Sequence, residues 1–268
     1  MVNEDRLKSA ICGLASVMSR LRRECPWDRR QSHASLRRYL IEECHEVLDA
    51  LDREDQDDLR AELGDLLFQI WFHAELASED EAQGFDLADV IQGVHDKLVR
   101  RHPHVFEDET ARDADWVRKN WERMKLDEGR RSRLEGLPPG LPALLAAQTI
   151  QDKASRVGFD WADYRGALDK LQEELGELQA ELPSPESKEV PSPALTHELG
   201  DVLFTIVNLA RHLGVVAEDA LRTTNQRFCR RFRGVEELAQ KMGQDLEGMD
   251  VAAMEELWQQ AKAREING

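Results

Sequence analysis

ELGDLLF, at residues 62–68, occurs a second time in this chain as ELGDVLF, at residues 198–204. Each copy follows a Glu-Glu-x-x-Glu cluster, formed by Glu42, Glu43 and Glu46 in the first half and by Glu173, Glu174 and Glu177 in the second. Side chains three or four residues apart share one face of a helix. The duplicated carboxylates therefore predict a divalent-cation site built from two helices.

The composition narrows the class of protein. The chain has 268 residues, 41% hydrophobic content and a formal net charge of -17. Such a charge repels phosphate backbones and anionic lipid, so no stable nucleic-acid or membrane binding is expected. The four cysteines show no CxxC pair, and no stretch has signal-peptide form or membrane-spanning length. These features predict a cytoplasmic protein.

Leu, Ala, Glu, Arg and Gln recur at three-to-four spacing along most of the chain, which predicts an all-α fold. Breaks fall at residues 25–28, 136–142 and 183–193, where Pro and Gly gather. The middle break is the expected domain boundary, and the last is expected to be an exposed loop. We predict two helical-bundle domains, residues 1–130 and 146–268, joined by a linker at 131–145.

The repeat extends beyond the acidic motifs. Lys97, Arg100 and Arg101 are matched by Arg227, Arg230 and Arg231, and Trp121 with Lys125 is matched by Trp258 with Lys262. Four blocks in the same order indicate a tandem duplication.

The helix of the second motif continues with Val202, Leu203, Phe204, Ile206, Val207 and Leu209, so we expect Glu198 and Asp201 to be shielded from water. Asp65 has similar apolar neighbours. Buried carboxylates are usually paired, protonated or bound to metal. Oxygen ligands suit a hard cation such as Mg²⁺, which leaves further positions for water and phosphate. Lys170 and Arg227, Arg230, Arg231 and Lys262 are then candidates to contact the phosphates.

Six features occur together in this chain: EExxE, ELGDxLF, a helix with paired arginines, a terminal WxxxK, Cys25-Pro26-Trp27-Asp28 and the segment 101–106. This combination resembles the two-domain MazG nucleoside triphosphate pyrophosphohydrolases. The resemblance covers nearly the whole chain. It implies Mg²⁺-dependent hydrolysis of a nucleoside triphosphate to the monophosphate and pyrophosphate, with Mn²⁺ as a substitute cation, in an all-α fold that forms a homodimer.

The resemblance also implies roles for particular residues. The metal ligands would be Glu174, Glu177, Glu198 and Asp201, with Glu43, Glu46, Glu62 and Asp65 as their counterparts in the first half. The catalytic residues would be Glu173, Glu174 and Lys170, with Glu173 as a further ligand or the base for water. The substrate would contact Lys170, Asn225, Arg227, Arg230, Arg231, Trp258 and Lys262.

The second half is the expected catalyst. Aligning the halves sets Tyr39 against Lys170 and His95 against Asn225, so the first half lacks a phosphate-binding cation and an amide. We expect the first half to retain metal binding, because all five acids persist there.

Two other interpretations stay open at this point. A di-iron carboxylate bundle would use Glu-x-x-His, a spacing that Glu42 and His45 provide, but the partner helices carry Asp where His is expected. A non-catalytic helical scaffold that only senses nucleotide is the second. The sequence leaves the base preference open, since Trp27, Trp121, Trp161 and Trp258 are candidates either for base stacking or for core packing.

Overall fold

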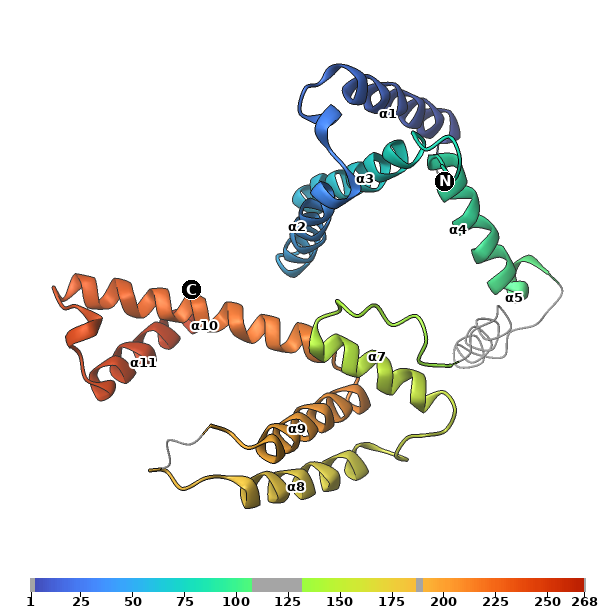
Figure 1. Cartoon of the computed structure of the whole chain (residues 1–268). Helices are drawn as coiled ribbons and strands as arrows, with labels where there is room; N and C mark the ends of the chain where they lie inside the picture. The colour runs from blue at the N-terminus through green and yellow to red at the C-terminus, as the bar shows by residue number, and fades with distance from the viewer. Residues whose placement is uncertain (1–2, 108–131, 187–189, 268) are drawn as a thin grey trace. The chain divides into compact units, whose positions relative to one another are not determined.

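The computed structural model describes residues 3–107, 132–186 and 190–267, and all regular structure within these ranges is helical (Figure 1). The all-α prediction is confirmed. The chain divides into two compact units, Met1–Val117 and Arg118–Gly268. The described part of the predicted linker 131–145 lies in the second unit, where Lys153 donates to the backbone carbonyl of Glu135. Trp121 and Lys125 lie outside the described residues.

The first unit is built on a helical hairpin. Its elements are α1 (Glu4–Glu24), the 3₁₀ turn η1 (Asp28–Arg30), α2 (His33–Asp52), α3 (Gln56–Ala77), α4 (Leu87–Arg101) and α5 (Pro103–Phe106). Helix α2 packs along α3, and α1 packs across α3. Ser32 caps α2 by accepting from the Ser35 N–H, and Asp55 caps α3 by accepting from two N–H groups. These caps fix where the two acid-bearing helices begin.

The core of the first unit lies where α1, α2 and α3 meet. Met18, Leu36, Trp71 and Phe72 are all buried there, and Phe72 is only 1% exposed. Burying side chains of this size supplies the main stabilising free energy, at about 1.5–3 kcal/mol each.

The second unit contains a similar hairpin. Its elements are α7 (Ala143–Ser155), α8 (Tyr164–Glu181), α9 (Pro193–His212), α10 (Ala217–Lys241), the 3₁₀ turn η2 (Leu246–Gly248) and α11 (Val251–Asn267). Helix α8 packs along α9, α7 packs on α9 and on α10, and α11 packs on α10 (Figure 1). Asp163 caps α8, and Ser192 with Pro193 starts α9. Within the break predicted at 183–193, residues 183–186 and 190–192 are non-helical, and Pro193 already belongs to α9.

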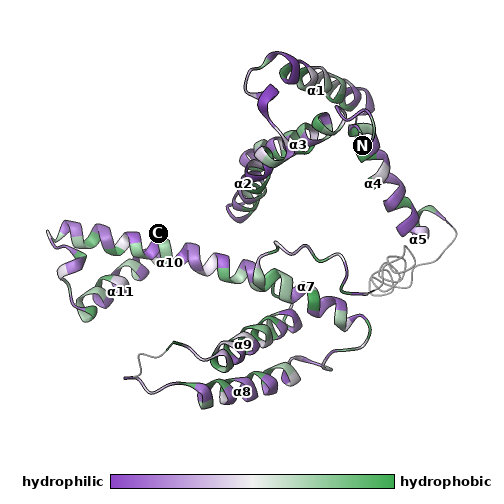
Figure 2. Cartoon of the chain, viewed as in Figure 1, coloured by the Kyte–Doolittle hydropathy of each residue, from purple (hydrophilic) through white to green (hydrophobic). Residues whose placement is uncertain are grey.

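The α8–α9 hairpin leaves much apolar surface open. Both helices carry hydrophobic and hydrophilic residues along their length (Figure 2). Exposed apolar side chains include Leu168 and Leu175 on α8 and Leu199, Leu203, Phe204 and Ile206 on α9, each 38–49% exposed. The expectation that apolar neighbours shield Glu198 and Asp201 from water is therefore wrong for the single chain. Both residues are partly exposed, and the described helices that pack on α9 are chiefly α8 and α7, with a smaller contribution from α10.

No single described helix is long and apolar enough to span a membrane, although the bent pair α9 and α10 reaches that length and hydropathy when counted together.

Candidate metal centre

Three carboxylates from two helices meet in the second half. Glu174 on α8 and Glu198 and Asp201 on α9 each offer an oxygen, and these oxygens lie within 4.8 Å of one another. Glu198 and Asp201 are three residues apart, so they share the face of α9 that lies against α8. Like charges this close repel, and a cation between them would relieve the repulsion.

Lys170 lies beside this cluster. Its Nζ is 2.8 Å from Glu174 and 2.6 Å from Glu173, and Glu174 is only 5% exposed. The hydrogen bonds to Glu173 and Glu174 raise the pKa of Lys170, which therefore stays charged at neutral pH. One lysine offsets one charge of the cluster and leaves it negative, which favours a further cation.

Glu177 lies one turn along α8 from Glu174 and is exposed. Partial desolvation, followed by the charge of Glu174, raises the pKa of Glu177, and the charge of Glu198 adds to the effect. The Glu177 carboxylate thus interacts electrostatically with the cluster but is not one of the three residues whose oxygens lie within 4.8 Å of one another. Its role as a fourth metal ligand stays a prediction.

The first half assembles the corresponding acids. Oxygens of Glu43, Glu62 and Asp65 lie within 4.8 Å of one another. Desolvation is the largest cause that raises the pKa of Glu43 and of Glu62, and the charge of Glu46 is next for both. Glu46 therefore belongs to the same negative cluster.

The position of Lys170 is occupied differently in the first half. Tyr39 stands there, and the Arg38 guanidinium lies 4.4 Å from the centre of its ring and donates to its hydroxyl. No described lysine forms an ion pair with the first acid cluster, whereas Lys170 does so in the second. The two clusters thus share carboxylates and differ in the cation next to them.

Apart from Lys170 on α8, the predicted substrate residues lie on α10 and α11. Asn225, Arg227 and Lys262 are exposed. Arg230 and Arg231 pair with Glu265 at 2.9 and 2.7 Å, and Trp258 packs on Phe228 with ring centroids 5.0 Å apart. These contacts join α10 to α11, while the acid cluster belongs to α8 and α9. Within the described residues no hydrogen bond or ion pair joins the two sets, and the roles of these residues stay predictions.

Sequence reasoning missed a group of polar residues behind the cluster. Gln151, Asn208 and Arg211 are buried or nearly so and line a cavity between α7 and α9. Comparison of the two repeats could have pointed to Asn208. Residue 208 corresponds to Phe72 in the first half, so an amide replaces a core aromatic side chain.

A helical hairpin with Glu-x-x-Asp facing Glu-Glu-x-x-Glu defines a class of all-α proteins that hold cations between paired helices. A model described as the MazG nucleotide pyrophosphohydrolase domain matches residues 31–106 and 164–235, and the chain belongs to this family. Both matched stretches contain an acid cluster.

Two relatives resemble the chain over almost its whole length. The nucleoside triphosphate pyrophosphohydrolase of Escherichia coli K12 is 46% identical over 261 residues, which are 95% of this chain and 97% of that protein. The nucleoside triphosphate pyrophosphohydrolase/pyrophosphatase MazG of Thermotoga maritima is 44% identical over 255 residues, which are 93% of this chain and 94% of that protein.

Proposed function

We propose that this protein hydrolyses nucleoside triphosphates, ribo- or deoxyribonucleotides, to the monophosphate and pyrophosphate, with the second half as the main catalyst. The observation that carries the proposal is the set of Glu174, Glu198 and Asp201 oxygens within 4.8 Å, next to the charged Lys170. Family membership and the names of the two relatives support the reaction.

The donor set suits Mg²⁺, with Mn²⁺ as a substitute. All three members of the cluster offer carboxylate oxygens and none offers nitrogen or sulfur, which is the preference of a hard cation. Glu177 would complete the set. When bound, the cation supplies positive charge for the phosphate oxygens and makes a nearby water more acidic. The described cluster contains no histidine, which argues against the di-iron alternative.

Glu173 and Lys170, beside the cluster, would handle the removal of a proton from the attacking water. Formation of the monophosphate and pyrophosphate breaks the anhydride bond between the α and β phosphates, and the attacking water must lose a proton. Glu173 is exposed and adjacent to Glu174, so we assign it as the acceptor of that proton. Lys170 Nζ, 2.6 Å from Glu173 Oε1, holds the carboxylate in place. The same ammonium group also lies where it can attract phosphate.

We also propose a homodimer. Apolar side chains on α8 and α9 remain exposed beside the acids, as a surface that another subunit covers would. The predicted substrate residues Asn225, Arg227, Arg230, Arg231, Trp258 and Lys262 lie on α10 and α11, whereas the acid cluster lies on α8 and α9. A second copy across the apolar face supplies these groups to the triphosphate most directly.

Other parts of the proposal follow from charge and cysteine chemistry. A net charge of -17 favours a small nucleotide, which a local cation can hold, over nucleic acid or membrane as partner. All four cysteines are free, in keeping with a cytoplasmic location.

The deciding experiment measures pyrophosphate release from a panel of nucleoside triphosphates with Mg²⁺, with Mn²⁺ and with EDTA. We expect release that depends on the cation, that Glu174→Gln abolishes and that the matched Glu43→Gln change in the first half largely spares. No cation-dependent release from the wild type would instead support the non-catalytic sensor. Loss in Glu43→Gln with full activity in Glu174→Gln would move catalysis to the first half.

A further inference from the structure

A cavity of about 580 Å³ lies against α9, the helix that also carries Glu198 and Asp201. It is bounded by α7, by α9 and by the segment 158–161 that follows α7. Its volume is within the range of small-molecule pockets, about 300–1,000 Å³. Phe204, on its wall, is three residues after Asp201 on α9 and so lies one helical turn from the cluster.

Gln151 gives this cavity a fixed hydrogen-bond acceptor. The side chain is 4% exposed, and its Nε2 donates to the backbone carbonyl of Phe204 at 2.8 Å. A carbonyl oxygen can only accept, so this bond fixes which end of the amide is which. Gln151 Oε1 is buried without a hydrogen-bond partner. An unpaired buried oxygen costs free energy that a ligand N–H group would recover.

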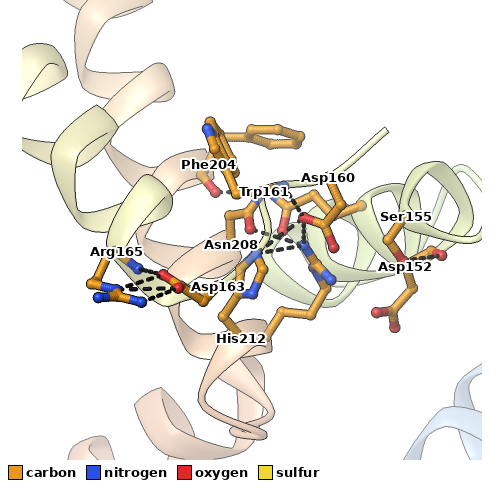
Figure 3. Close-up of polar contacts among 11 residues, drawn as sticks. Asp152, Ser155, Asp160, Trp161, Asp163, Arg165, Phe204, Asn208 and His212 are labelled. Atoms are coloured by element: carbon orange, nitrogen blue, oxygen red, sulfur yellow. Dashed lines mark hydrogen bonds and ion pairs between the residues drawn. The ribbon is translucent and has the colours of Figure 1, made fainter. Parts of the chain in front are cut away.

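Arg211 adds an unpaired donor. Its Nη2 donates to Asp160 Oδ1 at 2.5 Å and to Asn208 Oδ1 at 3.0 Å, while its Nε is buried without a partner. His212 Nε2 lies 3.0 Å from the same Asp160 oxygen (Figure 3). The network ties the segment after α7 to α9. One wall therefore offers an acceptor and a donor that the protein itself leaves unused.

The remaining lining is mostly apolar and includes aromatic rings. Phe159, Trp161 and Phe204 are 82%, 42% and 42% exposed. Trp161 lies against the backbone of Gly166, where a Cβ would come within 2.4 Å of the indole, so the glycine makes room for the ring. Exposed aromatic faces around an apolar cavity are suited to stacking on a flat heterocycle, at about 1–3 kcal/mol per base.

The described residues of the first half differ from the second at the matched positions of this wall. Its counterpart of Asn208 is Phe72, which is 1% exposed and packs with Met18, Leu36 and Trp71. The counterpart of Arg211 is Glu75, by the same alignment of the two motifs. Both halves have thus kept the acid cluster, while the positions of Asn208 and Arg211 carry different side chains in the first half, whose own unpaired buried atoms include Gln69 Oε1 and His73 Nε2.

We propose that this cavity binds the nucleobase of the substrate and that Gln151 Oε1 accepts a hydrogen bond from an N–H group on the edge of the base. The proposal rests on the proposed function, because it places the base of the triphosphate whose phosphates meet the acid cluster. Gln151 is then a specificity residue, and bases with an N–H donor on that edge are preferred.

The test compares ATP with purine riboside 5′-triphosphate, which lacks the 6-amino group and offers no N–H donor on that edge. We expect the wild type to prefer ATP by roughly 3- to 10-fold in kcat/KM, the contribution of one hydrogen bond. Gln151→Met keeps the side-chain size and should remove the preference. Gln148→Met is the matched control, because Gln148 lies one turn away and bonds Val215 and Ala217 instead of lining the cavity.

A second variant guards against misfolding of the first. Asn208→Phe copies Phe72 and should fill the cavity, raising KM for every nucleotide while circular dichroism stays helical. Calorimetric binding of AMP and of purine riboside 5′-monophosphate gives a readout that does not need turnover.

The outcomes separate the two claims. An ATP preference that survives in Gln151→Met, or AMP binding that Asn208→Phe leaves unchanged, overturns the assignment of the cavity while metal-dependent pyrophosphate release continues. Absence of pyrophosphate release from any nucleotide refutes the proposed function, and the AMP measurement then still decides the cavity.

Discussion

Replacing Glu198 by Gln is expected to remove activity and, in metal-free protein, to raise stability. Glu198 is partly buried and forms no ion pair with any described residue, while oxygens of Glu174 and Asp201 lie within 4.8 Å. Two unit charges at that separation repel by about 1 kcal/mol in bulk water and by about 3.5 kcal/mol at an effective dielectric constant of about 20.

The net gain is smaller than the sum of two such repulsions. Lys170 lies 2.8 Å from Glu174 and offsets part of the negative charge, and the Asp201 side chain is 48% exposed, so water screens it. We expect about 1 kcal/mol of added stability for Glu198→Gln in EDTA. For a unit of this size that corresponds to a rise in Tm of about 2–4 °C.

With saturating Mg²⁺, the wild type should become more stable than Glu198→Gln. The wild type gains stability when the cation binds the folded state, whereas the variant has lost one of three carboxylates and gains less. The same loss should lower kcat/KM at least about 100-fold, since even residues that only support metal ligands cost 10- to 100-fold.

The assay is thermal unfolding with EDTA and with Mg²⁺, alongside pyrophosphate release. Glu62→Gln, at the matched position of the first half, is the control and should retain most activity. A Glu198→Gln protein that is less stable than the wild type in EDTA, or that gains as much from Mg²⁺, would refute the cation site.

Three further changes test other parts of the site. Lys170→Met should lower kcat about tenfold, because the ammonium group that holds the Glu173 carboxylate in place is lost; an unchanged kcat would remove Lys170 as the group that positions Glu173. Mixing the inactive variants Glu174→Gln and Arg227→Ala should restore about a quarter of wild-type activity if two copies build each site, and no recovery would place both residues in one chain. Glu43→Gln should raise the Tm of EDTA-treated protein at neutral pH. Burial, followed by the charge of Glu46, raises the pKa of Glu43 in the folded state above its ordinary value of 4.5. Ionisation of Glu43 therefore lowers the stability of the wild type as pH rises through the folded-state pKa, and the Gln variant avoids this loss. The difference in Tm between the variant and the wild type should vanish as pH falls toward 4.5.

The helices and the acid clusters could be predicted from the sequence because they depend on local spacing. Glu198 and Asp201 share a face of any helix, and the caps Ser32, Asp55 and Ser192 act within three residues. The degree to which Glu198 and Asp201 are buried could not be predicted from the sequence. The apolar run after Asp201 indicates a covered helix, but whether its cover comes from the same chain or from another one depends on packing that the run does not specify.

The cavity illustrates a second limit of sequence reasoning. Gln151 and Phe204 are 53 residues apart and meet only when α7 packs on α9. An amphipathic helix carries a Gln at many positions without consequence, so nothing in the local pattern distinguishes Gln151 from Gln148. The distinction comes from tertiary contacts, which give Gln148 partners for both ends of its amide and give Gln151 a partner for one.

Comparison of the two halves separates what the metal needs from what the nucleotide needs. Both halves bring three carboxylates within 4.8 Å, so cation binding alone does not distinguish them. Around those acids, the first half places Tyr39 and the fully packed Phe72, whereas the second places Lys170 and the half-satisfied polar wall of Gln151 and Arg211. An unfilled cavity is of no use to a bare metal site and costs stability, whereas Lys170 offsets part of the negative charge and also places a cation where phosphate can bind. Their presence together in one half is what a substrate with phosphates at one end and a flat heterocycle at the other would require.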